Sequence, residues 1–235
     1  MRVGEPLRDP MVDSFEEATY RGRIGSRDMG GGTLSLEPLE TDGEITGYRQ
    51  RLSALIQGVS GYELDLTFQA DGNIIRSERY RLETHHRDDI VAVEEGVFPG
   101  VSSLQWGGEI EEYPHDICPL LGCAVVLRGL DFELGARRSI AIWLANTVWW
   151  EVETKVESRK EIELPCGRFD TWRVRAWPNF RPIAGILHHL IERLLPPFYL
   201  DFERDPPHRF LRFEFPSGPF PWNPRALVEA VEITR

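Results

Sequence analysis

The stretch VWWEVETKVESRKEIELPCGRFDTWRVRAW, residues 148–177, decides the fold class. Along residues 148–156, valine, tryptophan and threonine occupy every second position, which is the repeat of a half-buried antiparallel strand. Residues 157–160 then form a polar connection in this interpretation, and residues 161–164 begin a second strand. Residues 165–167, Pro-Cys-Gly, predict a tight turn, because proline fixes φ and glycine accepts a positive φ. The stretch therefore predicts a β-meander.

Similar strands are predicted on both sides of this stretch. Residues 62–69, YELDLTFQ, place tyrosine, leucine and phenylalanine on one face and polar side chains on the other. The three glycines at 30–32 fit a hairpin or bulge, because the Lys-Ser/Thr pair of a phosphate loop does not follow them. Short turn signals such as Asp42-Gly43 separate the strands and predict an antiparallel meander. The further predicted strands span residues 15–24, 33–39, 45–56, 62–69, 74–84, 90–98, 139–145, 210–215 and 226–234.

Two segments carry helical patterns. Residues 183–195, IAGILHHLIERLL, repeat apolar side chains at helical spacing and end at two prolines. Residues 119–131, PLLGCAVVLRGLD, fit a short helix followed by a strand, or a buried strand with a bulge; a helix over the first few residues is favoured. Residues 1–14 predict an extended or disordered arm, and residues 15–235 a single β-rich domain. The predicted fold is mainly β: one curved antiparallel sheet or incomplete β-barrel, with one or two helices across its concave face.

The C-terminal half also carries a pattern of turn and core residues that resembles an uncharacterised family. The pattern is E-x-x-x-x-P-x-G-x-F-D-x-x-R-V in one hairpin and P-P-x-R-x-x-R-F in a later strand. It resembles the DUF3108-like family, which is similar to the curved half-barrels of the lipoprotein-carrier (LolA-like) group. The resemblance implies a concave sheet that holds an apolar ligand, and it carries over no catalytic residue. The matching residues are Glu161, Pro165, Gly167, Phe169, Asp170, Arg173, Val174, Pro206, Pro207, Arg209, Arg212 and Phe213.

The charge balance excludes one class of partner. The chain has 38 acidic and 27 basic residues, and its net charge of −11 repels the phosphates of nucleic acids. The same charge disfavours adsorption to anionic lipid surfaces. A hydrophobic content of 41% with 28% charged residues is ordinary for a globular domain. We therefore expect an acidic globular protein with no nucleic-acid partner, and the composition leaves the oligomeric state open.

Cysteines and the N-terminal segment bear on location and cofactors. An odd number of cysteines, three, argues against a disulfide scaffold and favours a reducing compartment. No Cys/His spacing typical of zinc and no cofactor motif is present, so we predict neither a metal site nor a cofactor. The segment MRVGEPLRDPMVDSFEE lacks an apolar signal region, and no apolar run is long enough to span a membrane. These features predict a cytoplasmic protein without a membrane span.

Two polar groups are candidates for chemistry. His85 and Asp88 belong to a dense polar cluster at a predicted strand end, which fits acid–base work or a solvated hairpin. His115 and Asp116 form a pair in a glycine-rich loop, where a carboxylate can orient an imidazole for general-base catalysis; a plain surface loop is the alternative. If the protein is an enzyme, we expect these four residues to be catalytic.

The aromatic content of 11% includes seven tryptophans, which line hydrophobic pockets or fill cores. Together with the resemblance, it favours binding of a small hydrophobic ligand, such as a lipid, isoprenoid or polyketide, in the concavity. A cofactor-free isomerase, cyclase or hydratase that uses the same cavity is the first alternative, and a structural or partner-binding protein is the second. The predicted ligand-binding residues are Trp106, Tyr113, Trp150, Val152, Trp172, Leu187 and His188.

Overall fold

The computed structural model of the chain consists mainly of β-strands. It describes residues 5–87, 89–98, 101–103, 109–145, 148–179, 197–218 and 222–234. The strands up to residue 119 are β1 (Leu7–Arg8), β2 (Glu16–Ile24), β3 (Arg27–Thr41), β4 (Glu44–Ile56), β5 (Ser60–Asp71), β6 (Ile74–His86), β7 (Asp89–Val97), β8 (Val101–Ser103), β9 (Glu109–Glu112) and β10 (Ile117–Pro119). The strands that follow are β11 (Arg137–Ala145), β12 (Val148–Leu164), β13 (Gly167–Pro178), β14 (Phe198–Glu203), β15 (Phe210–Pro216) and β16 (Arg225–Thr234).

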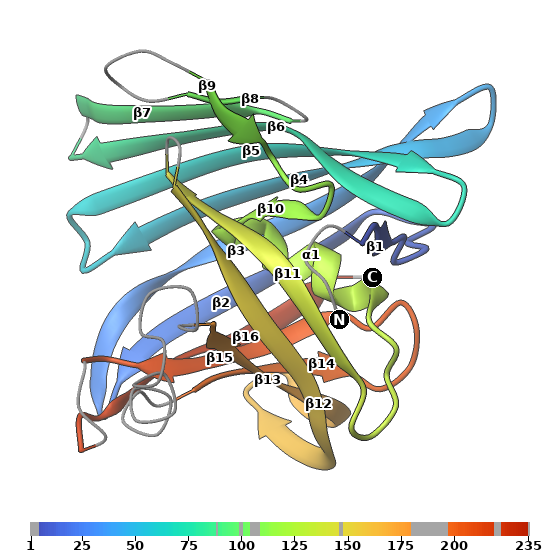
Figure 1. The fold of residues 1–235 in the computed structure, drawn as a ribbon. Coiled ribbons are helices and arrows are strands. Elements are labelled where there is room, and N and C mark those ends of the chain that lie inside the picture. The colour runs from blue at the N-terminus through green and yellow to red at the C-terminus, as the bar shows by residue number, and fades with distance from the viewer. Residues whose placement is uncertain are drawn as a thin grey trace, which may run out of the picture.

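Fourteen of these strands form one large curved sheet that does not close (Figure 1). Its order is β1-β6-β5-β4-β3-β2-β16-β15-β14-β13-β12-β11-β10, and β7 also pairs with β6. Neighbours are antiparallel except β10 and β11, which run parallel. β8 and β9 form a separate two-stranded sheet in the described part of the chain. The prediction of a mainly β, strongly curved, incomplete barrel is confirmed.

The β12–β13 hairpin corresponds to the stretch that decided the fold class. Every second side chain of β12 up to Val156 was predicted to lie on one face, and the last two of these, Thr154 and Val156, are buried. The predicted polar connection at 157–160 is wrong, because β12 continues without a turn to Leu164. A β-bulge between Val156 and Ser158 keeps the strand paired through this polar segment. The turn that ends β12 is where it was predicted, and Gly167 there has a φ of 140°.

A short helical segment fills part of the concave side between the two flanks of the sheet (Figure 1). It consists of η1 (Leu120–Gly122), α1 (Cys123–Val126) and η2 (Leu127–Gly129), which we call the inner segment. The helix favoured at the start of residues 119–131 is therefore confirmed, whereas the strand expected after it is a second 3₁₀ turn. The helix predicted over residues 183–195 lies outside the described residues.

The core lies on the concave side and is filled from both flanks of the sheet. It includes Leu66 from β5, Val126 from the inner segment and Phe202 from β14. Residues of the expected N-terminal arm reach it as well, since Leu7 and Val12 are buried there. A second, smaller hydrophobic cluster consists of Tyr20, Ile162, Leu164, Leu211 and Ala230.

Candidate functional site

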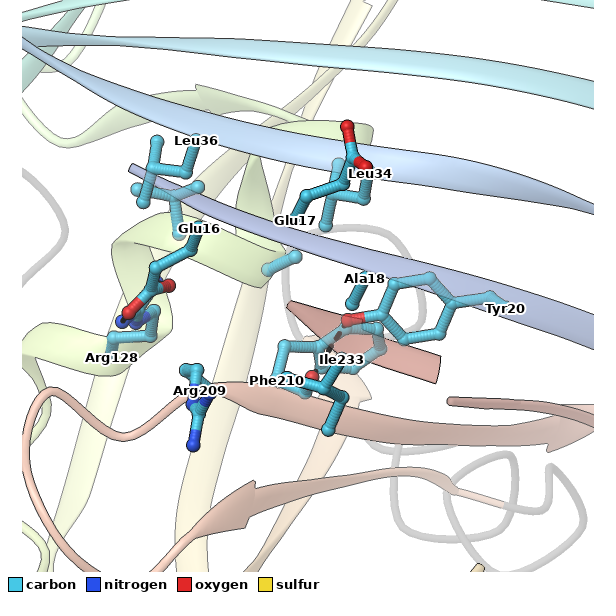
Figure 2. A pocket seen from close by; sticks show the side chains of 12 residues that line it. Glu16, Glu17, Ala18, Tyr20, Leu34, Leu36, Arg128, Arg209, Phe210 and Ile233 are labelled. Carbon is cyan, nitrogen blue, oxygen red and sulfur yellow. Dashed lines mark hydrogen bonds and ion pairs between the residues drawn. The ribbon is translucent and has the colours of Figure 1, made fainter. Parts of the chain in front are cut away.

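A small hollow lies on the concave side, between the inner segment and the strands β2, β3, β15 and β16 (Figure 2). The walls are apolar where Leu34 and Leu36 of β3 face Val125 of α1. Charged side chains border the hollow elsewhere, so it combines an apolar wall with a polar end. Its lining residues are Glu16, Glu17, Ala18, Tyr20, Leu34, Leu36, Ala124, Val125, Arg128, Arg209, Phe210 and Ile233.

The polar end is built on an ion pair between Arg128 and Glu16. Both guanidinium Nη atoms of Arg128 donate to the Glu16 carboxylate, at 2.7 and 3.0 Å. Nε of Arg128 donates to the carbonyl oxygen of Pro207 at 2.7 Å. Arg128 is buried, so its N–H groups need acceptors within the protein. The two parallel hydrogen bonds to Glu16 match the planar shape of the guanidinium group. The pair therefore ties the inner segment to β2 and to the turn between β14 and β15.

Tyr20 and Arg209 complete the polar end. The Tyr20 hydroxyl donates to the carbonyl oxygen of Phe210 at 2.7 Å, and burial raises the pKa of Tyr20 well above its ordinary value. Tyr20 is therefore a neutral donor at physiological pH. Arg209 pairs with Glu203 at 2.7 Å, while the Glu17 carboxylate points away from Arg128 (Figure 2). The groups at this end are suited to orienting a ligand rather than to transferring a proton.

The size of the hollow limits what it holds in this conformation. Its cavity volume is about 30 Å³. A single water needs about 10–15 Å³ by the same measure, and pockets for drug-sized ligands span roughly 300–1,000 Å³. The hollow accepts one or two waters, so a lipid-sized ligand has to displace a neighbouring element.

Among the elements that line the hollow, the inner segment is the one that does not pair with the strands of the sheet. Its N-terminal end is fixed by β10, where Ser77 donates to the carbonyl oxygen of Ile117 at 2.9 Å. Beyond β10, Gln50 donates to the carbonyl oxygen of Leu121 at 2.8 Å, and the ion pair of Arg128 holds the far end. Val125, Val126 and Leu127 are buried in the main core and add apolar attachment. Side chains rather than a strand ladder therefore hold the segment in place.

The predicted His115–Asp116 pair is split between solvent and core. His115 is exposed in the turn before β10, whereas Asp116 is fully buried. Burial lowers the pKa of Arg138, and the nearby Asp116 carboxylate opposes this shift. Asp116 thus belongs to the packing around the start of β10, next to the inner segment.

His85 lies away from this pair. It is on the outer face of β6, where its Nε2 is 3.5 Å from the Glu83 carboxylate. It lies eight residues along the strand from Ser77, which contacts β10, a separation of roughly 26 Å at ~3.3 Å per residue. The structure therefore does not bring His85 and His115 together, and Asp88 lies outside the described residues.

The predicted aromatic ligand residues pack mostly as core. Trp172 is buried and packs against Phe132 in a tilted arrangement, 6.1 Å between ring centroids, and Tyr113 packs on Phe98 at 5.7 Å. Trp150 is half-buried, and its indole nitrogen donates to the carbonyl oxygen of Asn179 at 3.0 Å. These rings do not border the hollow described above, and neither does Val152, which packs partly buried against the main core. Trp106, Leu187 and His188 lie outside the described residues.

The hollow and its charged end were not predicted from the sequence. Glu16 and Arg128 are 112 positions apart, and no local pattern links them. One signal was available: Arg128 is the only charged residue within the apolar run PLLGCAVVLRGL, and a charge in such a run needs a buried partner. Within the described residues, no group of three or more potential metal ligands occurs, and all three cysteines are free.

Comparison with known proteins shows the fold and no more. No family model and no curated protein matches the chain. A solved structure described as a "beta-barrel-like protein of domain of unknown function DUF1849", from Brucella abortus, is 11% identical, covers 94% of this chain and 97% of its own, and has a TM-score of 0.54. The DUF3108-like family is not named by these findings; a curved, barrel-like fold is the part of that resemblance that they support.

Two further solved structures bear on the predicted location. One is a "putative exported protein with YmcC-like fold" from Bacteroides fragilis, 10% identical over 98% of this chain and 100% of its own. The other is a "putative lipoprotein" from Parabacteroides distasonis, 10% identical over 100% of both chains; each has a TM-score of 0.34. These descriptions contradict the cytoplasmic location predicted from the sequence, and we withdraw it. It depended on the N-terminal residues and the cysteine count, which do not determine a compartment. A TM-score of 0.34 does not support assigning a different location to this chain.

Among the described helices, none has the length and apolar character that a membrane crossing requires.

Proposed function

We propose that this protein binds a small hydrophobic molecule, of the lipid, isoprenoid or polyketide class, on the concave side of its sheet. The observation that carries the proposal is the hollow beside the inner segment, which has apolar walls and one polar end. A ligand of this class presents a long apolar surface and one polar group, and the hollow offers a counterpart to each. A fold of the β-barrel-like type supplies the concavity.

Entry of the ligand requires residues 120–126 of the inner segment to shift, because the hollow itself is only about 30 Å³, while the Arg128–Glu16 pair stays in place as the polar end. Moving the segment exposes Val125 and Val126, which costs free energy in proportion to their apolar area. An apolar ligand offsets this cost by covering the surface that they leave. Leu120, which is 55% exposed at the start of the segment, offers a first apolar contact.

Binding of a dansylated undecanoic acid, followed by its fluorescence, tests the proposal. We expect saturable binding that unlabelled oleate displaces. Ala124→Leu adds bulk to the wall of the hollow and should weaken binding about tenfold or more. Ala92→Leu makes the same change on the exposed strand β7 and is the matched control. Absence of saturable binding, or equal binding by both variants, would overturn the proposal.

A further inference from the structure

The outer face of β12–β16 carries a compact group of charges on the side opposite the core. Asp201 of β14 lies between its two cross-strand partners, Arg173 of β13 and Arg212 of β15. The next residues along these strands, Val174, Leu200 and Phe213, face the core. We call the outer group the Asp201 cluster; its members are Lys160, Arg173, Asp201, Arg212, Glu214 and Arg225.

Three cations converge on the carboxylate of Asp201, whose side chain is 1% exposed. Nε of Arg212 donates to Oδ2 at 2.7 Å, Nζ of Lys160 is 3.3 Å from Oδ1, and Arg173 is 3.7 Å from Oδ2. The Glu214 carboxylate also pairs with Arg173, and Nε of Arg225 lies 2.5 Å from it. Two carboxylates therefore serve four cations.

The cluster holds two positive charges more than negative charges, in a chain whose net charge is −11. Burial lowers the pKa of Lys160; Asp201 opposes this shift, and the positive charges of Arg212 and Arg173 add to it. Burial alone would raise the pKa of Glu214, yet its bond with Arg173 lowers it. The lowered pKa of Glu214 reflects the positive charges around it, whereas that of Lys160 reflects mainly its burial. An anion from solution would offset the excess positive charge of the cluster.

The cluster also has donors to spare. Within the described part of the chain, Arg212 donates hydrogen bonds through Nε alone. The N–H groups of both its Nη atoms therefore remain available to an acceptor. Lys160 contacts one carboxylate oxygen and has further N–H groups. The Tyr199 ring lies under the guanidinium groups of Arg173 and Arg225, at 4.0 and 5.2 Å, and orients both.

We infer that the Asp201 cluster binds a phosphate group, as the free ion or as a phosphate monoester. A phosphate carries about two negative charges near neutral pH, which matches the excess of the cluster. Arg212 can present its two Nη groups to phosphate oxygens, and Lys160 adds a point charge beside them. The cluster lies on the opposite face of the sheet from the hollow, so this inference does not depend on the hydrophobic ligand.

Calorimetric titration of the whole chain with inorganic phosphate, at constant ionic strength, tests the inference. Lys160→Gln removes one cation and should weaken binding about tenfold. Glu214→Gln removes a competing carboxylate, so it should tighten binding by a few-fold. Arg204→Gln removes an exposed arginine that pairs with Asp170 outside the cluster, and it should leave binding unchanged. Glycerol phosphate in a parallel titration distinguishes a monoester from the free ion.

The opposite signs of the first two variants separate recognition from loss of structure, because unfolding cannot tighten binding. Heat release equal to that of sodium chloride at the same ionic strength would overturn the inference. So would identical affinities for the wild type, Lys160→Gln and Glu214→Gln.

Discussion

The concave and outer faces of β13–β15 are stabilised by different kinds of interaction. On the concave face, Val174 and Phe202 lie in one apolar core with side chains from the far flank of the sheet. On the outer face of the same strands, Asp201 is equally buried, but by charged neighbours. One face is therefore held by the removal of apolar surface from water, and the other by charges that must compensate one another.

This difference separates stability from recognition. Apolar packing is non-directional, so the concave face tolerates a ligand that replaces one apolar surface by another. The ion network is directional and depends on the count of charges. We therefore assign the hydrophobic ligand to the concave face and the anion to the outer face.

The largest effect is expected from opening the core. Phe202→Ala removes a ring that is fully buried, and it should lower the free energy of unfolding by about 3–5 kcal/mol, measured by urea denaturation. Phe15→Ala is the control, because Phe15 is 51% exposed and its loss should cost about 0.5 kcal/mol or less. Equal losses would mean that the inner face of β14 is not core.

A somewhat smaller effect is expected from the outer face. Asp201→Asn keeps the shape of the side chain but leaves three cations without their shared carboxylate, and it should cost about 3 kcal/mol. Asp170→Asn makes the same change at an exposed ion pair with Arg204 and should cost about 0.5 kcal/mol. If thermal melts of the two variants coincide, the outer network does not stabilise the fold.

The turn at Gly167 helps to set the register between β12 and β13, and this register determines which side chains lie on each face of the sheet. Its φ of 140° is unfavourable for a side chain, so Gly167→Ala should cost about 1–2 kcal/mol. Gly22→Ala is the matched control, because Gly22 has no positive φ and an added Cβ would meet its nearest neighbour at 3.6 Å. An unchanged melting temperature for Gly167→Ala would refute the turn geometry.

The smallest effect is a pH dependence at the turn between β14 and β15. Burial lowers the pKa of His208 from its ordinary 6.5, and its ring lies 4.1 Å from that of Phe132. Because the folded state disfavours the proton, the stabilising contribution of His208 is complete above pH 6.5 and is lost as the pH falls through its lower folded pKa. His208→Asn should therefore reduce the dependence of the melting temperature on pH below pH 6.5. His86→Asn, at an exposed site, should leave that dependence unchanged. Parallel curves for wild type and His208→Asn would contradict this.

The sequence predicts the inner face well and the outer face poorly. Alternation along residues 148–156 and the Pro-Cys-Gly turn follow from local geometry, so both were found. The polar segment at 157–160 was misinterpreted, because outward charges on a bulged strand resemble a loop. Charged residues on a strand are ordinarily solvated, and no local pattern shows that Asp201 gathers Lys160 from another hairpin.

The hollow was missed for a related reason. Its charged end needs Glu16 and Arg128, which the topology brings together from distant parts of the chain. The predicted site residues were mainly histidines and aromatic residues, because these residue types are common in binding and catalytic sites. In the described structure Trp172 packs in the core, and His115 faces solvent. Residue type alone does not indicate on which face a side chain lies.

An apolar ligand is expected to enlarge the hollow on the concave side by shifting residues 120–126 of the inner segment away from β2 and β3, while Arg128 stays paired with Glu16. Hydrogen exchange of the backbone amides, followed by mass spectrometry with and without oleate, tests it directly. We predict that oleate speeds exchange in residues 120–126 while β2 and β3 keep their protection. Exchange in residues 120–126 that is unchanged or slowed by saturating oleate would contradict this expectation.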